Sequence, residues 1–194
     1  FTFADISEAH DAIGLTATSG VIITIPQRDG TRLDYELDGK TAFIDQSLVA
    51  ENQIGRLNFT MMHEAAHQLF WMLYPEEYEV QTPRCVFRMA DEHTQYPVLN
   101  WEEWQTNVLT SYLLLPKELV YRHMADVGLK DGVSVLNRIY ARKDYERFSE
   151  AAKRLGVSKT ALTIRLSQLG LVGRNDLYDP YALVDIFPEK NEIA

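Results

Sequence analysis

The pattern of apolar and polar positions near the start of the chain has a period of two. Short runs rich in β-branched and aromatic residues occupy 21–25, 32–37 and 41–45, and the middle run alternates apolar with charged positions. Asp-Gly pairs at 29–30 and 38–39 separate the runs, and such pairs tolerate the positive φ of tight hairpins. The pattern predicts a small antiparallel meander with one face in water.

From residue 47 to residue 74 the pattern becomes helical. Ser47 is a suitable N-cap, Pro75 prevents the helix from continuing, and an interruption is expected near Gly55. The second half of the segment is apolar on nearly every side, which is typical of a helix buried inside a domain.

The rest of the chain is mainly helical in its pattern. A second helix is expected at about 101–115, a third from Lys117, and two or three more between 131 and 171. Residues 75–100 and the tail after 171 show no period and are interpreted as irregular. The apolar stripe of the second helix consists of Trp101, Trp104, Val108, Tyr112 and Leu115.

These elements predict an α+β fold, in which a small antiparallel sheet packs on a helical core. Residues 1–130 are expected to form the main domain, and residues 131–172 a helical C-terminal portion that resembles a helix-turn-helix. Residues 173–194 are interpreted as a tail.

Composition narrows the class of protein. The 194 residues carry a net charge of -9, which argues against broad, charge-driven binding of nucleic acid. The single cysteine, Cys85, excludes an intrachain disulfide and indicates a reducing compartment, so a cytoplasmic location is expected. No apolar run approaches the roughly 18 to 20 residues of a membrane helix.

The segment His63-Glu64-Ala65-Ala66-His67 has the H-E-x-x-H pattern. Residues four apart project from one face of a helix, so two imidazoles can share one zinc ion at Zn–N distances of about 2.0 Å. Glu64 lies beside the metal position, where a carboxylate can act as general base toward water. Because unpartnered polar groups are costly to bury, the apolar surroundings favour a metal site over two core histidines.

A catalytic zinc ion needs three protein ligands and an open position. Glu103 on the second predicted helix is one candidate for the third ligand, and it shares a face with Asn107. The residues that compete with it are Glu102, Asp91, Glu92 and His93. Two imidazoles and one carboxylate can hold zinc or manganese.

Two segments resemble the motifs of a known family. Residues 58–67, N-F-T-M-M-H-E-A-A-H, look like the R-F-T-x-A-H-E-L-G-H segment of the ImmA/IrrE family of zinc metallopeptidases. Residues 103–116, E-W-Q-T-N-V-L-T-S-Y-L-L-L-P, are similar to that family's E-x-x-A-N-x-F-A-x-x-L-L-M-P motif. The segment 151–172 resembles its C-terminal helical pattern, so the likeness extends from about residue 38 to residue 172.

The resemblance implies a cytoplasmic, zincin-like metallopeptidase in which His63, His67 and Glu103 bind zinc and Glu64 is the catalytic base. It also implies a protein substrate, a repressor-type transcription factor of the kind found in mobile-element and stress-response switches. The chain departs from the pattern by small or apolar exchanges that spare these four residues. The exchanges place Ala65 for leucine, Ala66 for glycine and Thr106 for alanine.

Two other functions compete with an active peptidase. A helix, a glycine turn and a second helix lie within 143–174, which carries seven basic and three acidic residues and would suit a DNA-binding module. The zinc site could also belong to a regulator without catalysis. For the peptidase, the candidate donors toward the oxyanion are His93, Tyr96 and Tyr112.

Overall fold

The computed structural model describes residues 1–27, 29–78, 85–89 and 101–177. It divides into two compact units: Phe1–Pro116 with Gly156–Ser158, and Lys117–Leu155 with the chain from Lys159 onward. Helices and strands are mixed along both units, so the α+β class is confirmed. Within the described ranges, no helix has both the length and the apolar character that crossing a bilayer requires.

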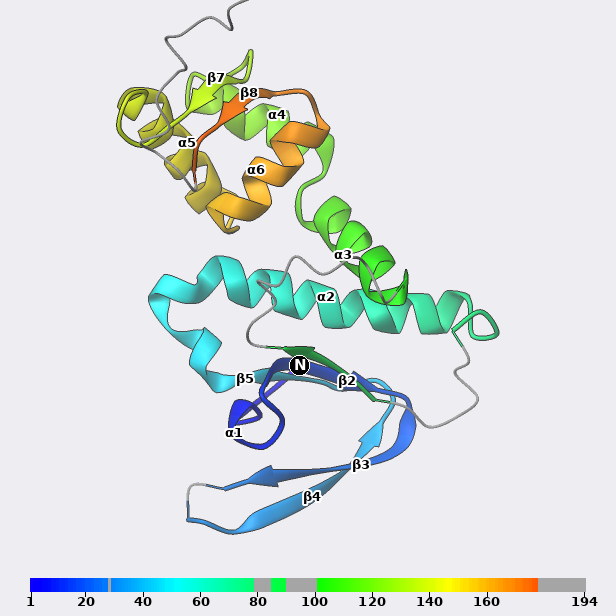
Figure 1. Cartoon of the computed structure of the whole chain (residues 1–194). Helices are drawn as coiled ribbons and strands as arrows, with labels where there is room; N and C mark the ends of the chain where they lie inside the picture. Colours follow the sequence, from blue (N-terminus) through cyan, green and yellow to red (C-terminus); the bar gives the residue numbers. More distant parts are fainter. Residues whose placement is uncertain (28, 79–84, 90–100, 178–194) are drawn as a thin grey trace, which may run out of the picture. The chain divides into compact units, whose positions relative to one another are not determined.

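A mixed four-stranded sheet forms the base of the first unit (Figure 1). Its strands, in spatial order, are β1 (Thr2–Ala4), β5 (Ala42–Asp45), β2 (Ala12–Ala17) and β6 (Cys85–Met89). β1 runs parallel to β5, and β2 runs antiparallel to both β5 and β6. The short helix α1 (Ser7–His10) connects β1 to β2.

The predicted meander is only partly present. β3 (Ser19–Pro26) and β4 (Arg32–Asp38) form the expected antiparallel hairpin, but the third run, β5, pairs with β1 and β2. Asp38 turns the chain out of the hairpin, because its carboxylate accepts hydrogen bonds from the backbone N–H groups of Lys40 (2.9 Å) and Thr41 (2.8 Å). All four residues of β5 are buried, as suits the interior of a sheet rather than an edge beside a hairpin.

The helical segment after β5 begins differently from the prediction. Two 3₁₀ turns, η1 (Gln46–Val49) and η2 (Glu51–Gln53), precede the long helix α2 (Ile54–Leu73). Asp45, and not Ser47, caps the first turn, since its carboxylate accepts from the Ser47 backbone N–H at 3.0 Å. The same carboxylate accepts from the N–H of Ser7 at 2.9 Å and so joins the start of α1 to this turn.

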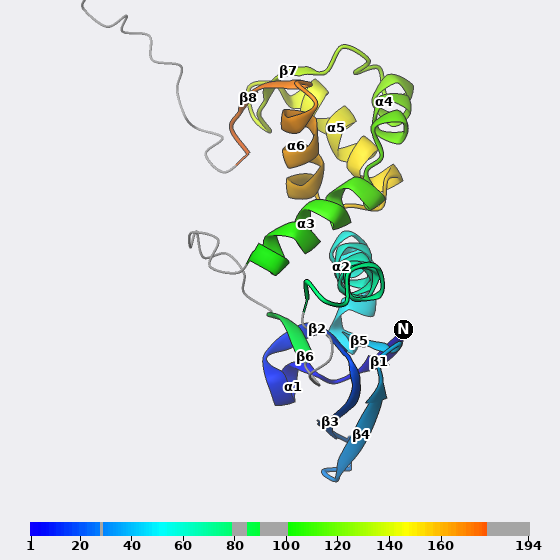
Figure 2. The same cartoon turned by 90° about the vertical axis from the view of Figure 1, so that its right-hand side faces the viewer.

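α2 lies against the sheet through contacts with β2 and β5, and α3 (Trp101–Leu114) packs on α2. The order sheet, α2, α3 is visible in Figures 1 and 2. Ile13, Ile44 and Leu48 form a buried cluster, against which Leu57 and Met61 of α2 pack. The larger core, between the sheet and the hairpin, contains Ile6, Leu15, Ala17, Ile23, Ile25, Leu37 and Phe43. This packing holds one face of α2 toward the sheet and leaves the next face for α3.

In its described residues, the second unit contains three helices and a pair of parallel strands. Its elements are α4 (Lys117–Asp126), β7 (Val133–Leu136), α5 (Arg142–Arg154), α6 (Lys159–Gln168) and β8 (Val172–Asn175). Leu162 and Leu166 on α6 are fully buried, as is Phe148 on α5, so α6 contributes to the core of this unit.

Strands β1 and β2 precede the first predicted run, and three further strands of the described residues lie where no strand was predicted. β7 falls in the region interpreted as helical, β8 in the tail, and β6 in the segment 75–100. Each is only four or five residues long, and none is followed by a tight hairpin to its partner. Because their pairing is with segments distant in sequence, local periodicity carries little signal for them.

Candidate metal centre

The two histidines of the H-E-x-x-H segment lie one turn apart on α2. Their Nε2 atoms are 3.2 Å from each other, and both side chains are about 1% exposed. Every side chain from Phe59 to Trp71 is buried or half-buried, as expected for a helix inside a domain, and Met72 and Leu73 at its end are exposed, at 69% and 62%. The buried positions are mostly polar or small, and they are Thr60, His63, Glu64, Ala66, His67 and Trp71.

Glu103 reaches the histidines from α3, two residues after the start of that helix. Its Oε2 lies 3.2 Å from His63 Nε2, and its Oε1 lies 3.0 Å from His67 Nε2. In the described part of the chain, these three side chains form the group of metal-ligating residues whose donor atoms all lie within 4.8 Å of one another. The structure therefore holds a His-His-Glu cluster that could hold a metal ion.

The spacing of the cluster agrees with that of a small divalent ion. Four ligands arranged tetrahedrally around zinc, at bond lengths of about 2.0 Å, are separated from each other by about 3.3 Å. The two Nε2 atoms are 3.2 Å apart, and each faces a different oxygen of Glu103 at 3.0 to 3.2 Å. With one donor atom taken from each residue, all separations lie within 4.8 Å. Two imidazole nitrogens and one carboxylate, supplied by rigid helices, are also a donor set that zinc accepts. The residues present therefore fit the group that the sequence motif implies.

The charges of the cluster are strongly coupled without a metal ion. Burial alone would lower the pKa of His67, but hydrogen bonds to Glu102 and Glu103 outweigh it and raise that pKa to about 9. Burial would raise the pKa of Glu103, yet hydrogen bonds from His63 and His67 hold it well below its ordinary value. Without a metal ion, the electrostatics of the site therefore favour a protonated His67 paired with the carboxylate of Glu103.

Glu64 lies on a different face of α2 from the two histidines, toward β2, and is fully buried. Gly14 of β2 makes room for its carboxylate, because a Cβ atom built at residue 14 would come too close to Glu64 Oε1. The nearby thiol of Cys85 is half-buried, and burial together with the charge of Glu64 raises its pKa to about 12. Cys85 packs against the larger core as the apolar side chain that its surroundings require.

The face that α3 turns toward α2 is not its aromatic stripe. Trp101, Trp104 and Tyr112 are 64%, 42% and 54% exposed, whereas Thr106 and Thr110 are fully buried. The two tryptophan rings stack on each other with centroids 4.6 Å apart. The face that carries Glu103 is packed toward α2, whereas the aromatic side chains of the stripe are largely exposed.

The competing ligands separate into two groups. Glu102 is near the cluster, but its Oε1 lies 3.4 Å from Nδ1 of His67, on the opposite edge of the ring from Nε2. Asp91, Glu92, His93 and Tyr96 lie outside the described residues. Tyr112 is on α3, and its role as an oxyanion donor stays a prediction.

Sequence reasoning missed three residues of the site. Gly14 lies against Glu64, and Trp71 donates a hydrogen bond to Glu102. Thr106 places its Oγ1 3.4 Å from Nδ1 of His67. A glycine inside an apolar run is a signal for close backbone approach, but nothing in the sequence says what approaches it. Trp71 belongs to an apolar helical segment, and Thr106 is a small exchange in the family motif, so neither pattern marks a site residue.

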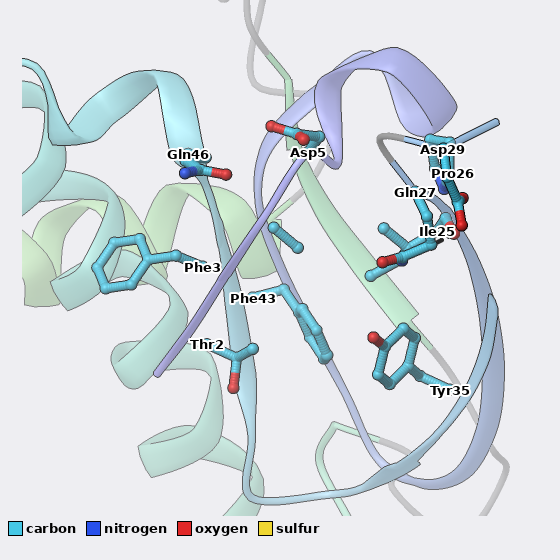
Figure 3. A pocket seen from close by; sticks show the side chains of 11 residues that line it. Thr2, Phe3, Asp5, Ile25, Pro26, Gln27, Asp29, Tyr35, Phe43 and Gln46 are labelled. Carbon is cyan, nitrogen blue, oxygen red and sulfur yellow. Dashed lines mark hydrogen bonds between the residues drawn. The ribbon is translucent and has the colours of Figure 1, made fainter. Parts of the chain in front are cut away.

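Two hollows of the first unit are separate from the cluster. One, of about 420 Å³, lies between β1, β5 and the hairpin, where the rings of Tyr35 and Phe43 meet at 5.7 Å (Figure 3). The other, of about 850 Å³, is lined by Gln68, Trp71 and Met72 of α2 and by the turn before β5. Among the described residues, none of the four predicted site residues lines either hollow.

Compared with known protein families, with curated proteins and with solved structures, the chain matches none of them. The assignment of function therefore rests on the residues of the cluster and on the motif resemblance.

Proposed function

We propose that this protein is a zinc-dependent endopeptidase. The observation that carries the proposal is the convergence of His63, His67 and Glu103, whose donor atoms, one from each residue, lie within 4.8 Å of one another. The carboxylate of Glu64, the residue after His63, is buried. Two histidines and a glutamate, with a further glutamate placed as base, is the arrangement that hydrolytic zinc sites use.

In this proposal His63, His67 and Glu103 hold the ion. When bound, zinc supplies a Lewis acid that polarises the scissile carbonyl and acidifies water. Glu64 takes a proton from the attacking water at its carboxylate, while the water oxygen bonds to the carbonyl carbon. The carbon–nitrogen bond then breaks, and Glu64 passes the proton to the departing amine. The products are a carboxylic acid and an amine, so atoms and charge balance.

The metal is tested by elemental analysis of the dialysed protein. We expect about one zinc ion per chain in the wild type and in Glu64→Gln, and a large loss in His63→Ala and Glu103→Ala. His123→Ala is the matched control, since His123 lies on α4 in the second unit. Manganese in place of zinc would correct the identity of the metal, and no metal after zinc is added back would refute the proposal.

Catalysis is tested by digestion of a proteome-derived peptide library, with new N-termini identified by mass spectrometry. The wild type should produce cleavages that Glu64→Gln, with its zinc retained, does not. Equal cleavage by both proteins would show that Glu64 is not the base.

We further propose that the substrate is a repressor-type DNA-binding protein. This rests on the resemblance of residues 58–67 and 103–116 to the ImmA/IrrE motifs. The test is digestion of a panel of folded helix-turn-helix repressors beside folded proteins of similar size that do not bind DNA. Cleavage confined to repressors supports the proposal, whereas equal cleavage of both sets contradicts it. Zinc without any cleavage would favour a regulator that lacks catalysis.

A further inference from the structure

The two nitrogens of the His67 ring have different surroundings. Nε2 faces His63 and Glu103, whereas Nδ1 faces two other oxygens of α3. One is Oε1 of Glu102 and the other is Oγ1 of Thr106, each 3.4 Å from Nδ1. The ring is 1% exposed, so protein groups rather than bulk water surround both nitrogens.

The carboxylate of Glu102 is itself held in place. The indole Nε1–H of Trp71, one turn after His67 on α2, donates to Glu102 Oε1 at 2.9 Å. Trp71 is 4% exposed, and its ring packs against that of His67 with centroids 5.8 Å apart. Trp71, Glu102 and His67 thus form one buried contact between α2 and α3, immediately beside the cluster.

We propose that Glu102 is a positioning residue, which accepts the Nδ1–H of His67 and thereby directs the lone pair of Nε2 into the metal position. This inference rests on the proposed zinc site. A neutral imidazole has a single N–H, and an acceptor at one nitrogen fixes the tautomer and the orientation of the ring. A carboxylate is a stronger acceptor for this proton than the neutral hydroxyl of Thr106.

The placement also explains why two adjacent glutamates begin α3. Neighbouring residues on a helix point about 100° apart, so Glu103 can reach the Nε2 side of the ring while Glu102 reaches its Nδ1 side. By sequence, Glu102 competes for the third ligand position. In the structure it has a separate role, because it faces Nδ1 of His67 while Glu103 faces Nε2.

The first test is the zinc affinity of the full chain, measured by competition with a chromophoric chelator. Loss of an acceptor of this kind weakens metal binding by about 10- to 100-fold, and we expect that loss in Glu102→Met. Glu102→Gln should lose less, because its amide oxygen can still accept. Trp71→Phe should weaken binding slightly, while Trp104→Phe, a change at an exposed tryptophan of α3, should leave it within about twofold.

The second test reads the proton directly. In zinc-loaded protein, long-range ¹H–¹⁵N spectra should show His67 with its proton on Nδ1, and Glu102→Gln should move that proton's resonance upfield. This readout also decides the question if Glu102→Met does not fold.

Three outcomes overturn the inference. They are zinc affinity in Glu102→Met within about twofold of wild type, a proton on Nε2 of His67, and a loss in Thr106→Val without a loss in Glu102→Met. None of these removes zinc from the wild type. A wild-type protein that binds no zinc would instead refute the proposed function itself, and the two failures are therefore distinguishable.

Discussion

Gly14→Ala should separate metal binding from catalysis. The added methyl carbon would lie 2.7 Å from Thr60 Cγ2 and 3.0 Å from Glu64 Cδ, and closer still to Glu64 Oε1, where ordinary contact begins at 3.4 Å. Relief requires the end of the Glu64 side chain to withdraw by about 1 Å, and a displacement of that size in a catalytic group can cost about 100-fold in rate. None of the three atoms nearest to the added methyl carbon belongs to His63, His67 or Glu103.

The stability cost should be modest. Overpacking costs about 1–3 kcal/mol, and the smaller entropy of an unfolded chain with alanine offsets about 0.4–1 kcal/mol of that. Gly30→Ala is the matched control, because Gly30 has a φ of 82° and open space around it. It should lose about 1 kcal/mol through backbone strain, far from Glu64.

The assay combines zinc competition with the rate of cleavage of the peptide most rapidly cut in the library. We expect Gly14→Ala to keep zinc affinity within about threefold while its kcat/KM falls about 100-fold toward the Glu64→Gln level. Gly30→Ala should match wild type in both. A wild-type kcat/KM in Gly14→Ala would show that this glycine does not make room for the base. A loss of zinc affinity as large as the loss of kcat/KM would show the same.

Three further predictions concern the metal-free state and the fold. The fold raises the pKa of His67 from 6.5 to about 9, so protonation of His67 stabilises the folded, metal-free protein. This stabilisation is complete below pH 6.5 and is lost as the pH rises through about 9. Since zinc must displace this proton, apparent zinc affinity should rise by up to about tenfold per pH unit over the same window; a flat profile between pH 7 and 9 would contradict the coupling. Zinc at about 1,000 times its Kd stabilises by about 4 kcal/mol, so chelation should lower Tm by roughly 10 °C in wild type and leave His63→Ala unchanged, as followed by circular dichroism. Asp45→Ala removes the buried acceptor for the N–H groups of Ser7 and Ser47 and should cost about 1–3 kcal/mol in urea unfolding, with Asp45→Asn losing less; equal losses would show that hydrogen bonding is not the cause.

Local sequence patterns were enough to predict the elements whose backbone hydrogen bonds join residues close in sequence. The hairpin β3–β4 was predicted from alternation and an Asp-Gly turn, and α2 and α3 from apolar spacing and prolines. β5 was also found as a strand, but its partners were not, because they come from segments before the hairpin and not from the run beside it. Register and pairing between distant segments depend on which faces are buried in the finished fold.

The aromatic stripe of α3 shows the same limit for a helix. Spacing placed Trp101, Trp104 and Tyr112 together on one side, but the structure exposes that side and buries Thr106 and Thr110. Apolar periodicity states which residues share a face and assumes that the apolar face is inward. The assumption fails here because the face of α3 that packs on α2 is the one that carries Glu103, which meets His63 and His67. The aromatic side chains lie on another face and are therefore exposed.

The sequence by itself determined that two imidazoles share one face of a helix with a carboxylate beside them, since the spacing in His63-Glu64-Ala65-Ala66-His67 converts directly into geometry through the helical repeat. The spacing left the third carboxylate open and the motif resemblance implied Glu103, but only the tertiary structure shows which carboxylate faces the Nε2 atoms of the histidines. Glu102 and Glu103 are chemically identical neighbours, and the rotation of α3 against α2 sends one to Nε2 and the other to Nδ1 of His67. That rotation results from the packing of residues far apart in the chain, which no local pattern contains.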